Sequence, residues 1–177
     1  NDNIDAHTIA SSADAIDFGN LTVARARCAA VSSSVRAIWG NGVNAPSNAH
    51  NVIDYVTISS QGNALDFGDT TQARWSARGA SNATRGLFGG GYAPTMYNII
   101  EFVTIASTGN AQDFGDLNTA KGGCAAMASS TRALWAGGET PGPQDEIDFV
   151  EIATTGNGVD FGDISSSTKT LAGGLSN

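Results

Sequence analysis

A segment of 17 residues occurs four times in this chain of 177 residues, and this repetition constrains the fold more than any other feature. The copies are IDAHTIASSADAIDFGN from Ile4, IDYVTISSQGNALDFGD from Ile53, IEFVTIASTGNAQDFGD from Ile100 and IDFVEIATTGNGVDFGD from Ile147. Self-similarity at a fixed spacing is the signature of a protein built from stacked repeats. The sequence therefore predicts one repeat domain over residues 1–177, with units of approximately 4–52, 53–99, 100–146 and 147–177.

Each unit has the pattern of four short strands. In the third unit, residues 100–105 and 111–114 are rich in β-branched and aromatic residues, residues 122–128 are small, and residues 132–138 end in Gly-Gly. Turn-forming residues separate these runs, and a loop at 139–146 leads to the next copy. Four short strands per unit at this spacing predict an all-β propeller of about four blades, each with four short antiparallel strands. The apolar residues at 100–105 do not alternate, which predicts that both faces of that strand are buried.

The composition of the chain limits the classes of partner that it can bind. With 41% hydrophobic and 15% charged residues, the chain has the composition of a folded protein. Its net charge of −8 argues against nucleic acid as a partner, because phosphate binding needs clustered Lys and Arg. It contains no run of 18 apolar residues, so no membrane insertion is expected.

The Gly-Gly strands carry a family resemblance. They read RAIWGNG from Arg36, RGLFGGG from Arg85 and RALWAGG from Arg132, with Asn41 replacing one glycine in the first. Together with the small-residue strands, they resemble the kelch repeat, in which Phe18, Phe67, Phe114 and Phe161 would replace the usual Trp. The units are also similar to repeats of bacteriophage tail-fibre and other virion proteins. This resemblance implies a kelch-like propeller with a structural or adhesive role, located in a virion or otherwise extracellular.

The register of the repeats leaves the first blade incomplete. Three Gly-Gly strands are available for four units, so one blade has an unpaired edge, which natural sheets avoid. Two arrangements remain open. Either this sequence belongs to a longer parent chain, or copies self-associate head to tail through their open blade edges.

No residue pattern points to catalysis or to a cofactor. The Asp-Phe-Gly triplet occurs four times without the other kinase motifs, so its Phe is interpreted as packing between blades and its Gly as making a turn. Carboxylates three residues apart, such as Asp66 and Asp69, suggest either calcium or turn capping, and capping is favoured because further oxygen ligands are lacking. His7 and His50 occupy unrelated repeat positions and build no metal site. The chain is therefore predicted to be no enzyme and to hold no metal or cofactor.

Other residues share a repeat register. Cys28 and Cys124 occupy the same position in different units, which disfavours a disulfide and predicts two small buried side chains. Two sets of basic residues are also in register and are predicted to pair with repeated acids across neighbouring blades: Arg25, Arg74 and Lys121, and Arg36, Arg85 and Arg132.

The loops after the Gly-Gly strands differ between units, reading VNAPSNAHN, YAPTMYN and ETPGPQDE. Variable loops on a rigid scaffold are where binding sites commonly lie. The candidate ligand-binding residues are Tyr92, Met96 and Tyr97, with His50 from the first loop, although these residues would equally serve to cover neighbouring blades. The leading hypothesis is a non-enzymatic structural or adhesive protein. The alternative is a carbohydrate-binding propeller whose loops contact a cell-surface glycan or protein.

Overall fold

The computed structural model describes residues 2–165, which form an all-β structure of antiparallel sheets. Three sheets have four strands each, and the strand order within each sheet follows the chain. The first contains β3 (Ala29–Ser32), β4 (Arg36–Gly40), β7 (Val52–Thr57) and β8 (Leu65–Asp69). The second contains β9 (Arg78–Ser81), β10 (Arg85–Gly89), β11 (Ile99–Thr104) and β12 (Gln112–Asp116). The third contains β13 (Ala125–Ala128), β14 (Arg132–Ala136), β17 (Glu146–Glu151) and β18 (Val159–Asp163).

Three smaller sheets complete the described structure. One pairs β1 (Asn3–Ala6) with β2 (Ile16–Asn20), and two are short hairpins: β5 (Val43–Asn44) with β6 (Asn48–Ala49), and β15 (Glu139–Thr140) with β16 (Gly142–Pro143). None of the described sheets closes on itself. The described residues also contain no helix long and apolar enough to cross a membrane.

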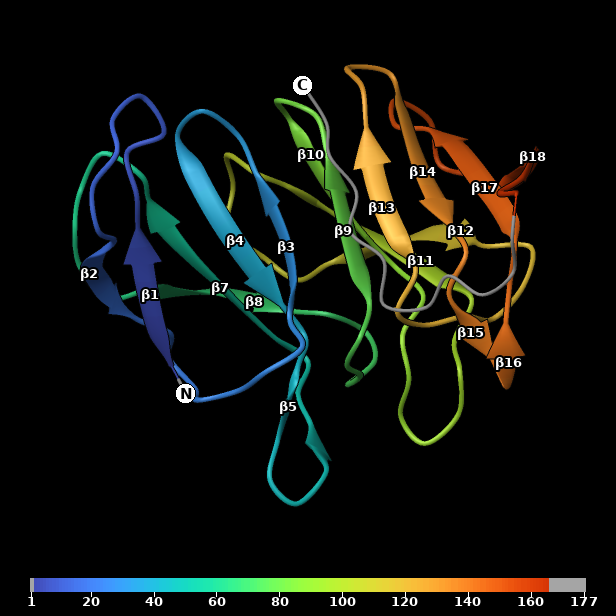
Figure 1. Cartoon of the computed structure of the whole chain (residues 1–177), viewed down its shortest axis with the longest axis horizontal. Coiled ribbons are helices and arrows are strands. Elements are labelled where there is room, and N and C mark those ends of the chain that lie inside the picture. Colours follow the sequence, from blue (N-terminus) through green and yellow to red (C-terminus); the bar gives the residue numbers. More distant parts are fainter. Residues whose placement is uncertain (1, 166–177) are drawn as a thin grey trace.

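The four-stranded sheets stand in a row, with their first strands β3, β9 and β13 side by side at the centre of Figure 1. Each sheet takes two strands from one sequence repeat and two from the next. The repeat boundary therefore falls in the middle of a sheet, and the covalent chain ties successive repeats together within it.

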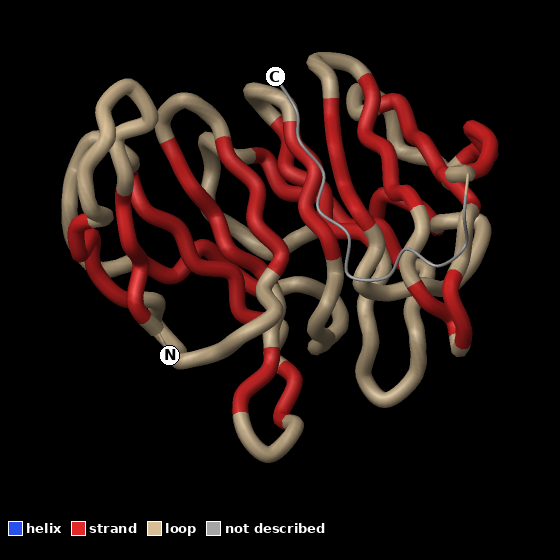
Figure 2. The backbone as a smooth tube through the Cα atoms, viewed as in Figure 1, coloured by secondary structure: helices blue, strands red, loops and turns tan. Residues whose placement is uncertain are grey.

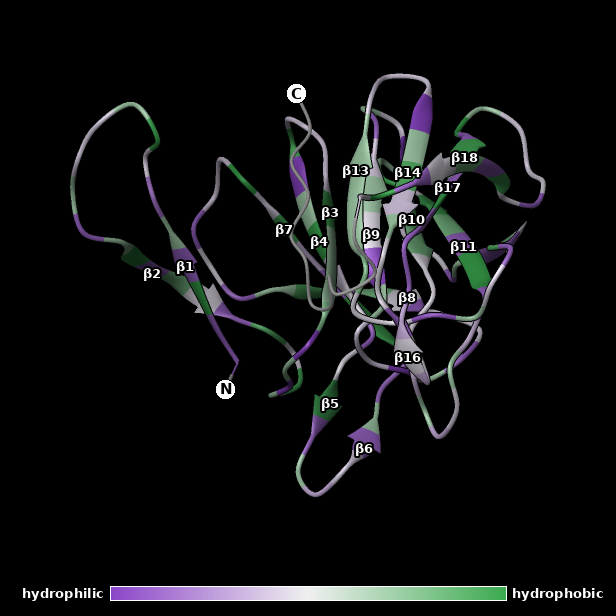
Figure 3. Ribbon diagram, turned by 45° about the vertical axis from the view of Figure 1, so that its right-hand side comes forward, coloured by the Kyte–Doolittle hydropathy of each residue, from purple (hydrophilic) through white to green (hydrophobic). Residues whose placement is uncertain are grey.

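The four strands expected in the third unit are confirmed as β11 to β14, with shifted ends. Strand β11 is buried on both faces, as the absence of alternation predicted. The small-residue strand is shorter than expected, because β13 begins at Ala125 and not at Gly122. The segment 139–146 is not a plain loop, since it contains the β15–β16 hairpin. Figure 3 shows that β4 and β14 begin with a hydrophilic residue and continue with hydrophobic ones.

The Gly of the Asp-Phe-Gly triplet lies in a β-bulge, so the expectation that it makes a turn is wrong. Strand β12 continues through Gly115 to Asp116. Ile100 pairs with Gly115 and Glu101 pairs with Asp113, which leaves Phe114 as the extra residue of the bulge. Gly115 has φ +145°, a backbone conformation that is open mainly to glycine.

The bulge receives a turn from the next repeat, and we call this contact the interlock. The backbone N–H of Gly156 donates to the carbonyl of Phe114 at 2.7 Å, and that of Gly158 donates to Asp116 at 2.6 Å. The Asn157 side-chain oxygen accepts from the N–H of Asp116 at 3.1 Å. Equivalent backbone pairings join 18–20 to 62–64 and 67–69 to 109–111.

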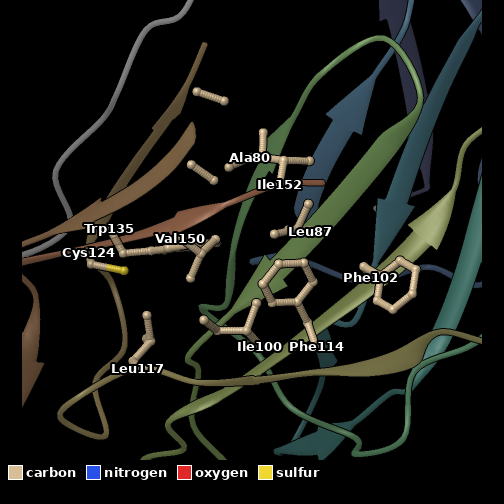
Figure 4. Close-up of a cluster of buried hydrophobic side chains, with 12 residues drawn as sticks. Ala80, Leu87, Ile100, Phe102, Phe114, Leu117, Cys124, Trp135, Val150 and Ile152 are labelled. Atoms are coloured by element: carbon tan, nitrogen blue, oxygen red, sulfur yellow. The ribbon is translucent and has the colours of Figure 1, made fainter. Parts of the chain in front are cut away.

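The hydrophobic core lies between successive sheets. Figure 4 shows the largest cluster, in which Leu87 and Ile100 of the second sheet face Trp135 and Val150 of the third. Gly89 is small for this packing, because a Cβ there would lie 2.6 Å from the Trp135 ring. Three of the four repeated phenylalanines are buried in these clusters, as expected: Phe18, Phe67 and Phe114. The fourth, Phe161, packs edge-on against the Phe149 ring of β17, with 5.7 Å between the ring centroids, and is 54% exposed.

Three buried ion pairs occupy equivalent positions in the three sheets. They are Arg25–Asp54 at 2.7 Å, Arg74–Glu101 at 2.6 Å and Lys121–Asp148 at 2.5 Å. The predicted pairing with acids is confirmed, but it does not join two four-stranded sheets, because each cation lies in the segment that enters a sheet and its acid lies in a strand of that same sheet. The acids also hold the incoming loop, since Asp54 accepts from the N–H and hydroxyl of Thr22.

The prediction that Arg36 and Arg85 pair with acids is wrong. Arg36 lies 4.6 Å above the Tyr55 ring and donates to the carbonyl of Ile105, which directly follows β11 of the next sheet. Arg85 makes the same contacts with Phe102 and Ile152. Arg132 also stacks on an aromatic ring, that of Phe149, and it does pair with an acid, Glu151, at 2.6 Å.

Both cysteines are free thiols, as expected. Cys124 is fully buried, and burial raises its pKa to about 11. Cys28 is only half-buried, so the prediction of a buried side chain was wrong for it; burial also raises its pKa.

Candidate functional site

Three loops project from one edge of the molecule, where a binding site was expected (Figure 2). They are the β5–β6 hairpin, the β10–β11 loop and the β15–β16 hairpin, all of which lie at the lower edge of Figure 1. Each loop follows a Gly-Gly strand. We call this side of the protein the loop edge.

The loop edge contains a pocket of about 480 Å³ between the second and third loops. Its lining combines two aromatic rings, two guanidinium groups, one carboxylate and a thioether, from Arg27, Trp75, Arg78, Tyr92, Met96 and Glu139, with Ser76 and Gly122. The segments that enter β3, β9 and β13 all contribute, so the site depends on three successive sheets.

Of the four residues selected from the sequence, the structure places Tyr92 and Met96 in this pocket. Tyr97 does not line it, and its hydroxyl donates to the carbonyl of Ala93 at 2.7 Å. Tyr97 therefore helps to shape the loop. His50 also lies outside the pocket, at the base of the first loop, where its N–H donates to the carbonyl of Gly42. Of the four residues predicted from the sequence, two therefore line the pocket and two form part of the loops.

Trp75 and Tyr92 form the aromatic part of the pocket. Their ring centroids are 4.9 Å apart, with an angle of 59° between the ring planes. The two residues also exchange backbone hydrogen bonds, at 3.0 Å from Trp75 N–H to Tyr92 and at 2.9 Å in the other direction. Because the backbone holds both residues, the rings are presented as one pre-formed surface.

Arg27 has a strained backbone and an exposed side chain. Its φ is +57°. The equivalent residues in the other units have similar φ angles, +56° at Ser76 and +64° at Gly123. The left-handed conformation costs a non-glycine residue about 1–2 kcal/mol. Among the described residues, the Arg27 guanidinium has no hydrogen-bond or ion-pair partner. A strained position that holds a free cation is a reason to look for a ligand there.

Arg78 is more firmly held than Arg27. Its Nε donates to the carbonyl of Cys124 at 2.9 Å, and its own carbonyl accepts from Trp135 Nε1 at 3.1 Å. The Nη groups have no hydrogen-bond partner within residues 2–165. They remain available for a bound anion.

The pocket residues differ from their equivalents in the other repeats. Trp75 corresponds to Ala26 and Gly122, and Arg78 corresponds to Ala29 and Ala125. Tyr92 corresponds to Val43 and Glu139, as the equivalent backbone bridges show. Arg27, Trp75 and Arg78 were not predicted from the sequence, because they lie outside the loops that follow the Gly-Gly strands. A position-by-position comparison of the units before the small-residue strand would have found them.

A second pocket of about 540 Å³ adjoins the first and shares Arg27 and Trp75 with it. Its other wall is the first loop, including Asn44, Pro46 and Ser47. The two pockets together form a groove along the loop edge, with Arg27 and Trp75 at its middle.

The described residues offer no cluster of three or more His, Cys, Asp or Glu side chains that could hold a metal ion. The pocket lining contains one carboxylate, that of Glu139, and neither His nor Cys. The chemistry that this arrangement supports is stacking, hydrogen bonding and charge pairing with a bound molecule.

Comparison of the chain with protein-family models gives no match, and comparison with curated proteins gives none either.

Proposed function

We propose that this chain is a non-enzymatic structural and adhesive repeat protein. In this proposal its sheets are blades of a kelch-like propeller, and its loop edge binds a partner. One observation carries the proposal, namely the separation of repeated from unit-specific residues. The interlocks and the buried ion pairs recur from sheet to sheet, whereas unit-specific residues such as Trp75 and Arg78 meet in one pocket. Such a division is expected of a rigid scaffold that presents one recognition surface.

The extracellular assignment, with a virion or tail fibre as its most specific form, is part of the same proposal. It is supported by the resemblance of the units to virion repeats and by the way in which each unit locks onto the next. Repeats joined in this manner can be extended by further identical contacts, either within a longer chain or between copies.

Carbohydrate binding is the second candidate, and the Trp75–Tyr92 pair favours it. Aromatic rings held side by side at the wall of an open pocket suit the flat apolar face of a sugar ring. In this case adhesion would occur through a cell-surface glycan.

The test of adhesion is binding of the purified chain to an array of polysaccharides and purified cell-surface proteins. We expect binding to at least one polymer, lost in both Trp75→Ala and Tyr92→Ala. The control is Leu65→Ala, which removes a 60% exposed side chain from β8 and should leave binding unchanged. Binding that survives both pocket variants would place the adhesive surface elsewhere, and shortening of the bound polymer would contradict a non-enzymatic role.

The propeller is tested separately by imaging. Negative-stain microscopy of the purified protein should show disc-shaped particles with sheets arranged around a central axis. A straight stack of sheets without a common axis would contradict the propeller and leave the adhesion test unaffected.

A further inference from the structure

The basic residues of the described chain fall into three groups. Three occupy the buried ion pairs and three stack on aromatic rings at equivalent positions, so these six belong to the repeated framework. The two that remain within residues 2–165 are Arg27 and Arg78, and both line the same pocket. In a chain with a net charge of −8, this pocket concentrates the cations that the framework does not use.

We propose that this pocket binds a carboxylate-bearing sugar ring of an acidic polysaccharide. In this arrangement the ring lies against Trp75 and Tyr92, and its carboxylate pairs with Arg27 and Arg78. Guanidinium groups match carboxylates through paired, charge-assisted hydrogen bonds. The inference rests on the proposed adhesive function and specifies its ligand class.

The number of available cations favours a single acidic ring over a nucleic acid. Nucleic-acid binding relies on many phosphate contacts, which two arginines in an acidic protein do not supply. One carboxylate needs only one or two guanidinium partners.

The backbone pairing disfavours a peptide. A peptide commonly binds by adding a strand to an open sheet edge. Here the backbone of Trp75 is already bonded to Tyr92, and Gly122 is bonded to Glu139. The pocket therefore offers side chains to a ligand, and its backbone bonding groups are largely used.

The adjoining pocket gives a polymer a place to continue. It shares Arg27 and Trp75 with the first and adds the amide of Asn44 and the hydroxyl of Ser47, groups suited to sugar hydroxyls. Glu139 is the one acid of the first pocket, and its charge opposes an anionic ligand. It can still accept hydrogen bonds from hydroxyl groups of the ring.

The experiment is calorimetric titration of the purified chain with a uronic-acid trisaccharide and with the same trisaccharide methyl-esterified. The ester keeps the ring and removes the charge. Binding of the acid should be at least tenfold tighter than binding of the ester, and it should weaken as salt is added. Glu139→Gln should tighten binding of the acid, because it removes an opposing charge.

The variants replace each pocket residue by its equivalent in another repeat, so the backbone conformation is already known to accept the new residue. They are Arg27→Gly, from Gly123, Arg78→Ala, from Ala125, and Trp75→Ala, from Ala26. Each arginine variant should weaken binding of the acid by about tenfold or more and leave the ester unchanged. Trp75→Ala should weaken both.

The outcomes separate this inference from the proposed function. If the acid and the ester bind equally and both lose binding in Trp75→Ala, the acidic-sugar assignment is overturned while the proposed adhesive function stands. An oligo-glutamate peptide that binds as tightly as the acidic sugar would assign the pocket to peptide carboxylates and overturn the sugar. If neither trisaccharide binds while the array identifies another polymer, the inference fails alone. If no polymer binds at all, both fail.

Discussion

Gly68 and Gly109 touch across the boundary between the first and second four-stranded sheets, and a Cβ on Gly68 would lie 2.5 Å from the carbonyl group of Gly109. Gly68 also has φ +144°. Two independent requirements, one of space and one of conformation, therefore exclude a side chain here. The same two requirements hold at Gly19 and Gly115, and they make the contact between repeats testable.

Gly68→Ala should lower the free energy of unfolding by about 3 kcal/mol. Roughly 1–2 kcal/mol comes from the positive φ, and the rest comes from forcing the Gly109 turn out of the bulge. Urea unfolding followed by tryptophan fluorescence measures the loss.

Gly162→Ala is the matched control. Gly162 occupies the same repeat position with φ +127°, but no described atom lies within 4 Å of a Cβ built on it. The Gly162→Ala variant should therefore lose only the part of the unfolding free energy that comes from the positive φ, about 1–2 kcal/mol. Equal losses in the two variants would show that the interlock contributes no stability.

Arg74→Met should destabilise the protein by about 3–5 kcal/mol, because it leaves the fully buried Glu101 carboxylate without its partner at 2.6 Å. The double variant Arg74→Met with Glu101→Leu removes both charges and should recover much of that loss. A double-mutant cycle by chemical denaturation gives the coupling between the two residues. A loss below about 1 kcal/mol in the single variant would contradict a role for the pair in stability.

Asp148 should make stability depend on pH in the acid range. Burial raises its pKa above the ordinary value of 3.8, although the bond to Lys121 opposes the shift. The folded state therefore holds the Asp148 proton to higher pH than the unfolded state does. The stability from this group is complete below pH 3.8 and is lost as pH rises through the folded pKa.

Asp148→Asn removes this titration, while the other carboxylates remain common to both proteins. The difference in unfolding free energy, wild type minus variant, should therefore be larger at about pH 3.5 than at about pH 7. A constant difference between these pH values would contradict the raised pKa.

Arg27→Gly should stabilise the fold by about 1 kcal/mol, because glycine adopts φ +57° without the strain that Arg carries. Thermal unfolding measures the gain. Ser76→Gly, at φ +56°, should give a similar gain and serves as the comparison. A loss of stability in Arg27→Gly would mean that the arginine side chain supports the fold, and would weaken its assignment to ligand binding.

The two thiols should react at different rates in the folded protein. Cys124 is fully buried with its pKa raised to about 11, whereas Cys28 is half-buried. At mildly alkaline pH, a thiol reagent followed by mass spectrometry should modify Cys28 first and Cys124 only on unfolding. Modification of both at one rate would contradict the buried environment of Cys124.

The groove along the loop edge illustrates how far prediction from the sequence could go. Tyr92 and Met96 were found because they lie in a loop that differs visibly between units. Trp75 and Arg78 were missed because Trp75 precedes a strand and Arg78 begins it, and residues at such positions were interpreted as part of the repeated scaffold. Their proximity to Tyr92 depends on backbone bonds between segments 17 residues apart in sequence (75 to 92), which periodicity does not reveal.

The sequence by itself determined the strands, their antiparallel order and their period, because these depend on local features: β-branched runs, turn residues and glycines repeated at fixed spacing. The pairing of Arg25, Arg74 and Lys121 with acids was also predicted, because these residues and the acids recur in register. Only the tertiary structure decided that Phe-Gly forms a bulge, that the turn of the next repeat enters it, and that Arg27, Trp75 and Tyr92 meet. The bulge and the Trp75–Tyr92 contact depend on backbone pairing within one repeat, whereas the inserted turn and Arg27 come from a neighbouring repeat and are placed by the packing of successive sheets.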